Sequence, residues 1–200
     1  MNATVTLVLG GARSGKSAWA EHLAAASGRP VAYLATAVAG DEEMAARIAA
    51  HRAARSPQWR TIEAPYDVTD AMLAQVTEGE VVLVDCLTFW VSNLLLREIG
   101  DDPDVAMTTA EVQAQEDDVV ARTHALLDAA PRVGVDLILV SNEVGMGLVP
   151  PFPLGRLYRD VLGRVNQTVA QRADSVVLMV AGLPIDLRQL TRVTPGWPDS

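Results

Sequence analysis

Short apolar runs alternate along this chain with longer segments of helical periodicity. The runs are Thr4–Leu9, Val31–Ala35, Val81–Val84, Val135–Val140 and Ser175–Val180. Each is apolar at consecutive positions rather than at every second one, which is typical of parallel strands that are covered on both faces. The pattern therefore predicts a mostly parallel sheet with helices on both sides.

Helical patterns separate the predicted strands. They cover Ala18–Ala26, which closes at Gly28, then Asp41–Arg55, a segment from Thr108 to near Pro131, and apolar residues at helical spacing from Leu154 to Val169. Thr108 and Glu111 have the spacing of a capping box. This alternation predicts a three-layer α/β fold. We expect one domain over residues 1–182, followed by a partly disordered tail over 183–200, which contains three prolines and lacks strong periodicity.

A glycine-rich octapeptide follows the first predicted strand. It fits the phosphate-loop pattern G-x-x-x-x-G-K-[ST] at every position and consists of Gly10, Gly11, Ala12, Arg13, Ser14, Gly15, Lys16 and Ser17. Lys16 is the only lysine among the 16 lysine and arginine side chains. Its flexible ammonium suits a position between β- and γ-phosphates better than a planar guanidinium does. The loop predicts nucleotide binding at a helix N-terminus, with the Ser17 hydroxyl on Mg²⁺.

An aspartate ends the third predicted strand. Val81–Val84 is apolar and Asp85 follows it directly. A carboxylate at the carboxyl end of a strand near a phosphate loop can hold Mg²⁺ directly or through water. Because apolar runs often end in an acid, the alternative is that Asp85 caps the segment that follows.

A histidine and several arginines share the predicted helix 41–55. Arg47 lies four residues before His51, and Arg52 and Arg55 lie one and four residues after it. The arginines can hold a phosphate against the imidazole. The alternative is a surface histidine on an amphipathic helix. His22 and His124 have less distinctive neighbours, and we expect them to be structural.

Composition and charge narrow the function classes. The net charge of −9 and the pI of about 4.7 argue against general binding to nucleic acid or to anionic membranes. The single cysteine, Cys86, excludes an intrachain disulfide and fits a reducing compartment. The sequence shows neither a signal peptide nor an apolar run of transmembrane length. These features predict a cytoplasmic protein.

Several separated motifs coincide with those of one family. The chain resembles the bifunctional adenosylcobinamide kinase/adenosylcobinamide-phosphate guanylyltransferases of cobalamin biosynthesis, over roughly residues 4–182. The matching segments are Gly10–Ser17, Tyr33–Ala37, Asp41–Met44, Arg47–Ile48, His51–Arg52, Trp59–Thr61 with Glu63, Asn142–Gly147 and Gly163–Gln167. The histidine segment and the Asn-Glu-Val-Gly-Met-Gly loop are far more specific than the phosphate loop.

The resemblance implies a RecA-like P-loop NTPase fold, a homotrimer and two reactions. A nucleoside triphosphate, ATP or GTP, phosphorylates the aminopropanol hydroxyl of adenosylcobinamide. GTP then guanylylates a histidine, and the GMP passes to the substrate phosphate. On this sequence the nucleophile is His51, with Lys16 as the other catalytic residue and Ser17 and Asp85 on Mg²⁺. The implied nucleotide contacts are Gly10–Ser17, Thr36, Ala37, Val38, Arg52, Arg55, Glu63 and Asp85.

Two other functions fit the phosphate loop itself. One is a simple small-molecule kinase in which the histidine helix only covers the site. The other is a nucleotide-gated regulatory protein that binds a partner. The guanine-reading Asn-Lys-x-Asp motif of such switches is absent, because Lys16 is the only lysine.

Overall fold

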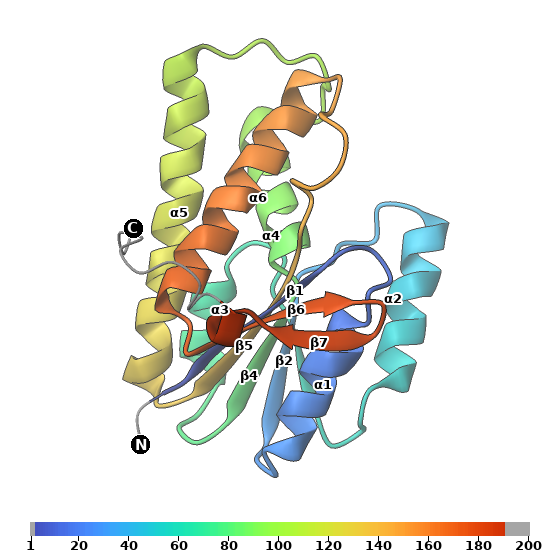
Figure 1. Ribbon diagram of the computed structural model, residues 1–200, viewed down its shortest axis with the longest axis vertical. Helices are drawn as coiled ribbons and strands as arrows, with labels where there is room; N and C mark the ends of the chain where they lie inside the picture. The colour runs from blue at the N-terminus through green and yellow to red at the C-terminus, as the bar shows by residue number, and fades with distance from the viewer. Residues whose placement is uncertain (1–2, 191–200) are drawn as a thin grey trace.

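The protein forms a seven-stranded sheet with helices on both faces (Figure 1). The structure, a computed structural model, describes residues 3–190 apart from the side chains of residues 47 and 54. Across the sheet the strand order is β3-β2-β4-β5-β1-β6-β7. Strands β1 to β6 are parallel, and β7 runs antiparallel to β6. The strands are β1 Val5–Gly10, β2 Val31–Ala35, β3 Arg60–Glu63, β4 Val81–Asp85, β5 Asp136–Asn142, β6 Ser175–Val180 and β7 Leu183–Asp186.

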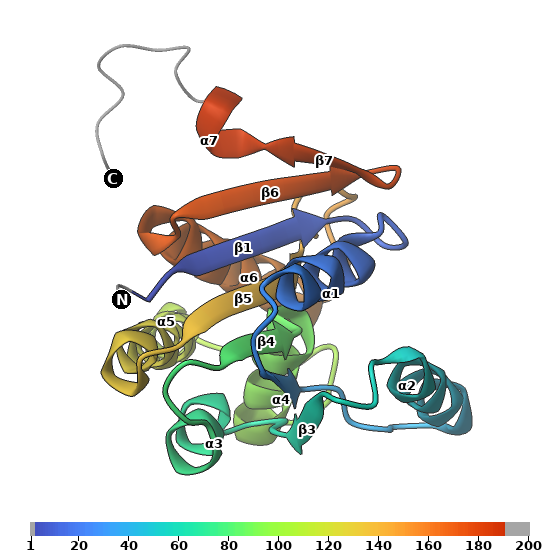
Figure 2. The same ribbon diagram turned by 90° about the horizontal axis from the view of Figure 1, so that it is seen from below.

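Two apolar clusters attach the helices to the sheet. On one face α1 packs through Ala20 and Ala24 in a cluster that includes Val8. On the other face α3, α4, α5 and α6 share a cluster with Leu7 and Leu9 (Figure 2). Neighbouring residues of β1 therefore enter opposite layers, which is why the strand is apolar at consecutive positions. The helices are α1 Lys16–Ala26, α2 Glu42–Ala54, α3 Val68–Gln75, α4 Leu87–Ile99, α5 Thr109–Val133, α6 Pro153–Arg172 and α7 Leu187–Leu190.

Helix α2 lies away from the helices of both layers, beside the carboxyl end of the sheet (Figure 2). It begins after Asp41, whose Oδ1 accepts a hydrogen bond of 2.7 Å from the Met44 N–H. None of its described side chains is buried. The helix thus takes its position from its two connections and from partly buried Met44 and Ile48 rather than from a buried core face.

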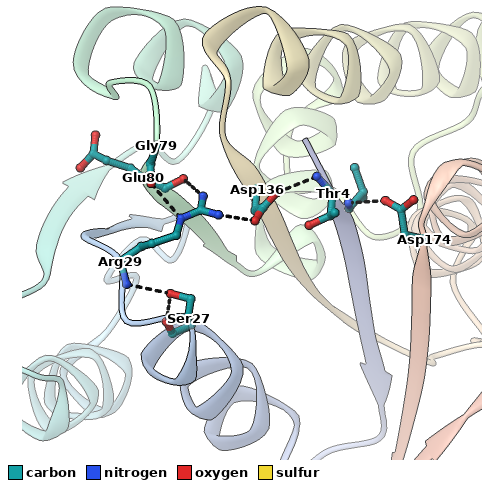
Figure 3. Close-up of polar contacts among 9 residues, drawn as sticks. Thr4, Ser27, Arg29, Gly79, Glu80, Asp136 and Asp174 are labelled. Carbon is teal, nitrogen blue, oxygen red and sulfur yellow. Dashed lines mark hydrogen bonds and ion pairs between the residues drawn. The ribbon is translucent and has the colours of Figure 1, made fainter. Parts of the chain in front are cut away.

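A polar network joins the amino ends of the strands, at the edge of the sheet opposite the carboxyl ends of the parallel strands (Figure 3). Asp136 accepts hydrogen bonds from the Thr4 N–H at 2.7 Å and from Arg29 at 2.5 Å. Arg29 also donates to the carbonyls of Gly79 and Glu80. Burial acts to raise the pKa of Asp136, but these donors outweigh it and lower that pKa below its usual value.

The predicted fold class is confirmed, and the structure adds elements that the sequence pattern did not reveal. All five predicted strands are present, as are the capping box at Thr108 and Glu111 and the helix that it opens. Strand β3 and helices α3 and α4 were not predicted. Residues 183–190, the first part of the tail that was expected to be partly disordered, form β7 and α7, and β7 pairs with β6. The rest of that tail, 191–200, lies outside the described residues.

Within residues 3–190, we find no helix with both the length and the apolar character needed to cross a membrane.

Candidate active site

The phosphate loop connects β1 to α1 at the carboxyl edge of the sheet. It turns through Arg13 and Gly15, whose φ angles are 56° and 92°, and the Ser14 N–H donates to the Gly11 carbonyl at 3.3 Å. Lys16 Nζ donates to the same carbonyl at 3.1 Å. The ammonium therefore lies over the loop, in the position from which it can contact phosphate oxygens.

The loop packs tightly against β6 and the turn that follows it. A Cβ atom at Gly10 would lie 2.4 Å from Ser14 Oγ and 2.8 Å from the Met179 carbonyl oxygen. The Gly182 N–H in the β6–β7 turn donates to the Ser14 carbonyl at 3.0 Å. The turn between β6 and β7 thus helps to hold the phosphate loop in place.

A pocket of about 570 Å³ opens beside this loop. Most of the predicted catalytic and nucleotide-contacting residues line it, although they come from five separate segments of the chain. They are Ala12, Arg13, Ser14, Gly15, Lys16, Ser17, Ala37, His51, Arg52, Arg55, Glu63 and Asp85. The predicted juxtaposition of the histidine helix with the phosphate loop is therefore present in the structure.

Four of the predicted contacts do not line the pocket: Gly10, Gly11, Thr36 and Val38. Thr36 is fully buried, and its hydroxyl is used within the fold. Its hydroxyl donates to the Cys86 carbonyl at 2.7 Å and accepts from the Cys86 N–H at 2.8 Å. Thr36 thus fixes the chain just after Asp85, where the Asp85–Cys86 peptide is cis.

His51 is exposed in the last turn of α2 and is the only one of the three histidines that lines the pocket. His22 lies on α1 with its ring centroid 5.4 Å from that of Trp19, and His124 is exposed on α5. Neither lines this pocket. The geometry therefore favours His51 over the other two histidines as a group that acts on a bound nucleotide.

Arg52 and Arg55 differ in how firmly they are held. Arg52 Nη1 lies 3.9 Å from Glu63 Oε1, with side chains 67% and 56% exposed, so the pair contributes little stability and can separate easily. The Arg55 guanidinium carbon lies 3.4 Å from the centroid of the Tyr33 ring, a cation–π contact. Arg55 therefore presents a fixed cation to the pocket, and Arg52 an adaptable one.

Asp85 and Tyr33 lie at the base of the pocket. The Tyr33 hydroxyl donates to Asp85 Oδ2 at 2.8 Å. Burial, and after it the Asp85 carboxylate, raises the pKa of Tyr33, so the phenol remains a donor. Burial and then Asp85 also raise the pKa of Glu21 on α1, while Arg55 and His51 act to lower it. Asp85 thus lies close to both the Glu21 carboxyl and the Arg55 guanidinium.

The pocket offers few oxygen ligands for a metal ion. This suits Mg²⁺, which keeps several water and phosphate ligands, better than it suits a metal whose ligands all come from the protein. Among residues 3–190 no group of three or more His, Cys, Asp and Glu side chains has the arrangement of a metal cluster. Ser17 and Asp85 line one pocket with a hydroxyl and a carboxylate. Mg²⁺ usually takes one or two protein oxygens and completes its shell with water and phosphate oxygens.

Sequence reasoning assigned no role to several pocket residues, among them Asn142, Cys86 and Thr88. The signal for Asn142 was its place two residues after the predicted strand Val135–Val140, at the edge where α/β folds bind ligands. Burial, and then Asp85, raises the pKa of the Cys86 thiol to about 11, so this thiol stays protonated at neutral pH. Thr88 accepts a hydrogen bond from the Asn142 N–H at 3.0 Å.

Unsatisfied polar atoms gather at this pocket. Four buried side-chain atoms of the described residues have no hydrogen-bond partner, and three of the four belong to pocket-lining residues: Ser14 Oγ, Arg55 Nε and Asn142 Oδ1. Buried polar atoms in proteins are nearly always paired. A polar ligand bound in this pocket could supply the missing partners.

The parallel sheet, the phosphate loop and the aspartate at the end of β4 place the chain among the P-loop nucleotide-binding proteins. A sequence model of the cobinamide kinase / cobinamide phosphate guanyltransferase family matches residues 6–187. The chain belongs to that family.

Two curated relatives agree with this assignment. The bifunctional adenosylcobalamin biosynthesis protein CobP of Pseudomonas aeruginosa is 46% identical over 182 residues, which cover 91% of this chain and 96% of the relative. The corresponding CobU protein of Escherichia coli is 44% identical and is covered over 98% of its length. Among solved structures, that of the RadB recombinase is similar with a TM-score of 0.45 and 18% sequence identity. The alignment covers 88% of this chain and 73% of the RadB chain.

Proposed function

We propose that the protein phosphorylates the aminopropanol hydroxyl of adenosylcobinamide and then transfers GMP from GTP to the new phosphate, giving adenosylcobinamide-GDP. The observation that carries the proposal is that His51 and the phosphate loop line the same pocket. Membership in the cobinamide kinase / cobinamide phosphate guanyltransferase family supports it. So do the names of the relatives, which are bifunctional proteins of adenosylcobalamin biosynthesis.

In the first reaction the substrate hydroxyl attacks the γ-phosphorus of a nucleoside triphosphate, and the nucleoside diphosphate leaves. This transfer needs positioned phosphates and stabilised charge rather than a protein nucleophile. Lys16 and the N–H groups of the phosphate loop supply that stabilisation. We propose that ATP or GTP serves as the phosphate donor.

In the second reaction an imidazole nitrogen of His51 attacks the α-phosphorus of GTP, and pyrophosphate leaves. The phosphate oxygen of the substrate then attacks the phosphoramidate and releases His51. A covalent intermediate divides a transfer between two anions into two easier steps. We propose that Arg52 and Arg55 bind the phosphate. The weak, exposed contact of Arg52 with Glu63 and the cation–π contact of Arg55 with Tyr33 support this.

Ser17 and Asp85 would hold Mg²⁺ at the phosphates, where the ion supplies neutralisation of the developing charge. The Tyr33 hydroxyl orients Asp85 from behind. We also propose the homotrimer that the family resemblance implies, which sedimentation of the purified protein would test.

Product analysis tests the proposed function. Wild-type protein incubated with adenosylcobinamide, ATP, GTP and Mg²⁺ should form the phosphate and then the GDP derivative, separable by chromatography. His51→Ala should form the phosphate but not the GDP derivative, because only the second reaction uses the imidazole. His124→Ala is the matched control, since His124 is exposed on α5 and lies outside the pocket-lining set.

The outcomes separate the proposal from the other two functions. Wild-type protein that makes only a phosphorylated product would be a simple kinase, and protein that makes neither would fit a nucleotide-gated binding protein. If His51→Ala still makes the GDP derivative, the nucleophile is another group.

A further inference from the structure

Strand order gives Asn142 a central place in the pocket. Strand β5 lies between β1, which leads into the phosphate loop, and β4, which ends at Asp85. Asn142 is the last residue of β5 and is in register with Gly10. Its side chain therefore enters the pocket between the phosphate loop and the proposed metal-binding carboxylate, and it is one of the residues that line the pocket.

The backbone of Asn142 is held firmly. Its N–H donates to Thr88 Oγ1 at 3.0 Å, and its carbonyl accepts from Asn166 Nδ2 at 3.0 Å. Asn166 is buried on α6, and its Oδ1 accepts a hydrogen bond of 2.6 Å from Ser141. The next residue, Glu143, donates its N–H to the Gly10 carbonyl at 3.3 Å. Every one of these bonds to Asn142 uses its main chain.

The side chain of Asn142, in contrast, is not used to hold the fold. Its Oδ1 is buried and has no hydrogen-bond partner among the described residues. An amide buried without a partner is costly and needs an explanation. Asn142 also lines the pocket, so a polar ligand bound there could supply a partner to its amide. A side chain on a rigid strand end that is not used by the fold is available for preorganised contact with a substrate.

We propose that the Asn142 amide positions the terminal phosphate and the attacking hydroxyl in the kinase reaction, and that it is not needed for guanylylation of His51. This inference rests on the proposed function and assigns one residue to one of its two reactions. An amide can donate to a phosphate oxygen through its NH₂ group and accept from a hydroxyl through its oxygen. These two contacts would align the hydroxyl with the phosphorus that it attacks, as an in-line transfer requires.

The proposed step balances without a further reactant. The hydroxyl oxygen forms a bond to the γ-phosphorus, the bond from that phosphorus to the β–γ bridging oxygen breaks, and its electron pair leaves on the nucleoside diphosphate. The hydroxyl proton passes to an oxygen of the transferred phosphoryl group. The transition state is loose, so the contribution of Asn142 is to align and to stabilise charge.

Selectivity follows from where the two side chains enter. His51 lies on α2, which follows β2, and Asn142 ends β5, with β4 and Asp85 between those strands. The two groups therefore approach a bound triphosphate from different sides of Asp85. Asn142 is in register with Gly10, which leads into the phosphate loop where the β- and γ-phosphates are expected to bind. For guanylylation, the α-phosphate would have to reach His51 on the other side of Asp85.

The test compares both reactions in Asn142→Ala and Asn142→Asp. Transfer of label from [γ-³²P]ATP to adenosylcobinamide measures the kinase reaction, and labelling of the protein by [α-³²P]GTP measures guanylylation. Asn142→Ala should lower kcat of the kinase reaction on the order of 10²-fold, with kcat/KM falling equally. Asn142→Asp should lower it at least as far, because a carboxylate repels the phosphate. Protein labelling should be unchanged in Asn142→Ala.

Two controls separate this role from a structural one. The thermal midpoint of Asn142→Ala should not fall, because no hydrogen bond to a described residue uses the side chain. Gln113→Ala, which removes an exposed amide on α5, should leave both reactions unchanged. An equal fall of both reactions, a lowered thermal midpoint, or an undiminished kinase rate in Asn142→Ala would each overturn the inference. Absence of kinase turnover in the wild type would instead overturn the proposed function, and the inference with it.

Discussion

Replacing Gly10 with alanine adds one methyl group at the tightest point of the phosphate loop. The new Cβ would lie 2.4 Å from Ser14 Oγ and 2.8 Å from the Met179 carbonyl oxygen. The first contact involves a side chain that can rotate away. The second involves the backbone of β6, which is held in the sheet on both sides by β1 and β7. Relief therefore requires the loop or the strand to move.

Overpacking of this kind costs about 1–3 kcal/mol, which for a protein of this size lowers the thermal midpoint by roughly 2–12 °C. Thermal unfolding followed by circular dichroism measures the shift. Gly11→Ala is the matched control, because a Cβ there meets nothing within 4 Å. Its effect should stay within about 0.5 kcal/mol.

A double variant identifies which contact matters. Gly10→Ala combined with Ser14→Ala removes the hydroxyl but leaves the Met179 carbonyl, so most of the destabilisation should remain. Equal thermal midpoints for Gly10→Ala and Gly11→Ala would refute the argument that Gly10 is required by close approach.

Three further predictions concern other parts of the molecule. Lys16→Ala should lower turnover of both reactions by about 10²-fold or more with an unchanged circular dichroism spectrum, and wild-type-like turnover would remove the phosphate-loop assignment. Asp85→Asn should raise the Mg²⁺ concentration needed for half-maximal activity; an unchanged titration means that the metal has another ligand. The lowered pKa of Asp136 implies stability that is present above its unfolded value of 3.8 and is lost as the pH falls through the lower folded value. Urea unfolding between about pH 5 and 2 should therefore depend less on pH in Asp136→Asn, and equal slopes would contradict this.

The elements that were predicted are those whose signal is local. The phosphate loop is a contiguous motif, and strands such as β2 are continuous apolar runs that tertiary context does not override. Helix α4 also had a local signal that was missed, since Leu87, Trp90, Val91, Leu94 and Leu95 follow helical spacing and are buried.

Strands β3 and β7 could not be predicted from the local sequence, because each is stabilised by pairing with a strand elsewhere in the chain. Strand β7 contains Pro184 and only four residues, and it exists because β6 offers an antiparallel edge. Strand β3 is equally short, and within residues 3–190 it pairs only with β2.

The candidate site shows the same division. Its phosphate-binding residues follow from one motif, whereas nothing in the local sequence distinguishes Thr36, which is buried against Cys86, from Ala37, which lines the pocket. Successive side chains of a strand point to opposite faces of the sheet. The residue at which this alternation ends depends on the loop that follows, so the sequence does not show which of the two faces the pocket. The unpaired amide of Asn142 likewise becomes visible only when the partners of its neighbours are known.

The central claim is that His51 carries GMP covalently in the pocket formed with the phosphate loop. Mass spectrometry of the intact protein after incubation with GTP and Mg²⁺, followed by peptide mapping, tests it most directly. The wild type should gain one GMP, on the peptide that contains His51, with the acid-labile and base-stable character of a phosphoramidate. His51→Ala should gain none. Wild-type protein without the adduct, or an adduct on any other residue, would contradict the claim.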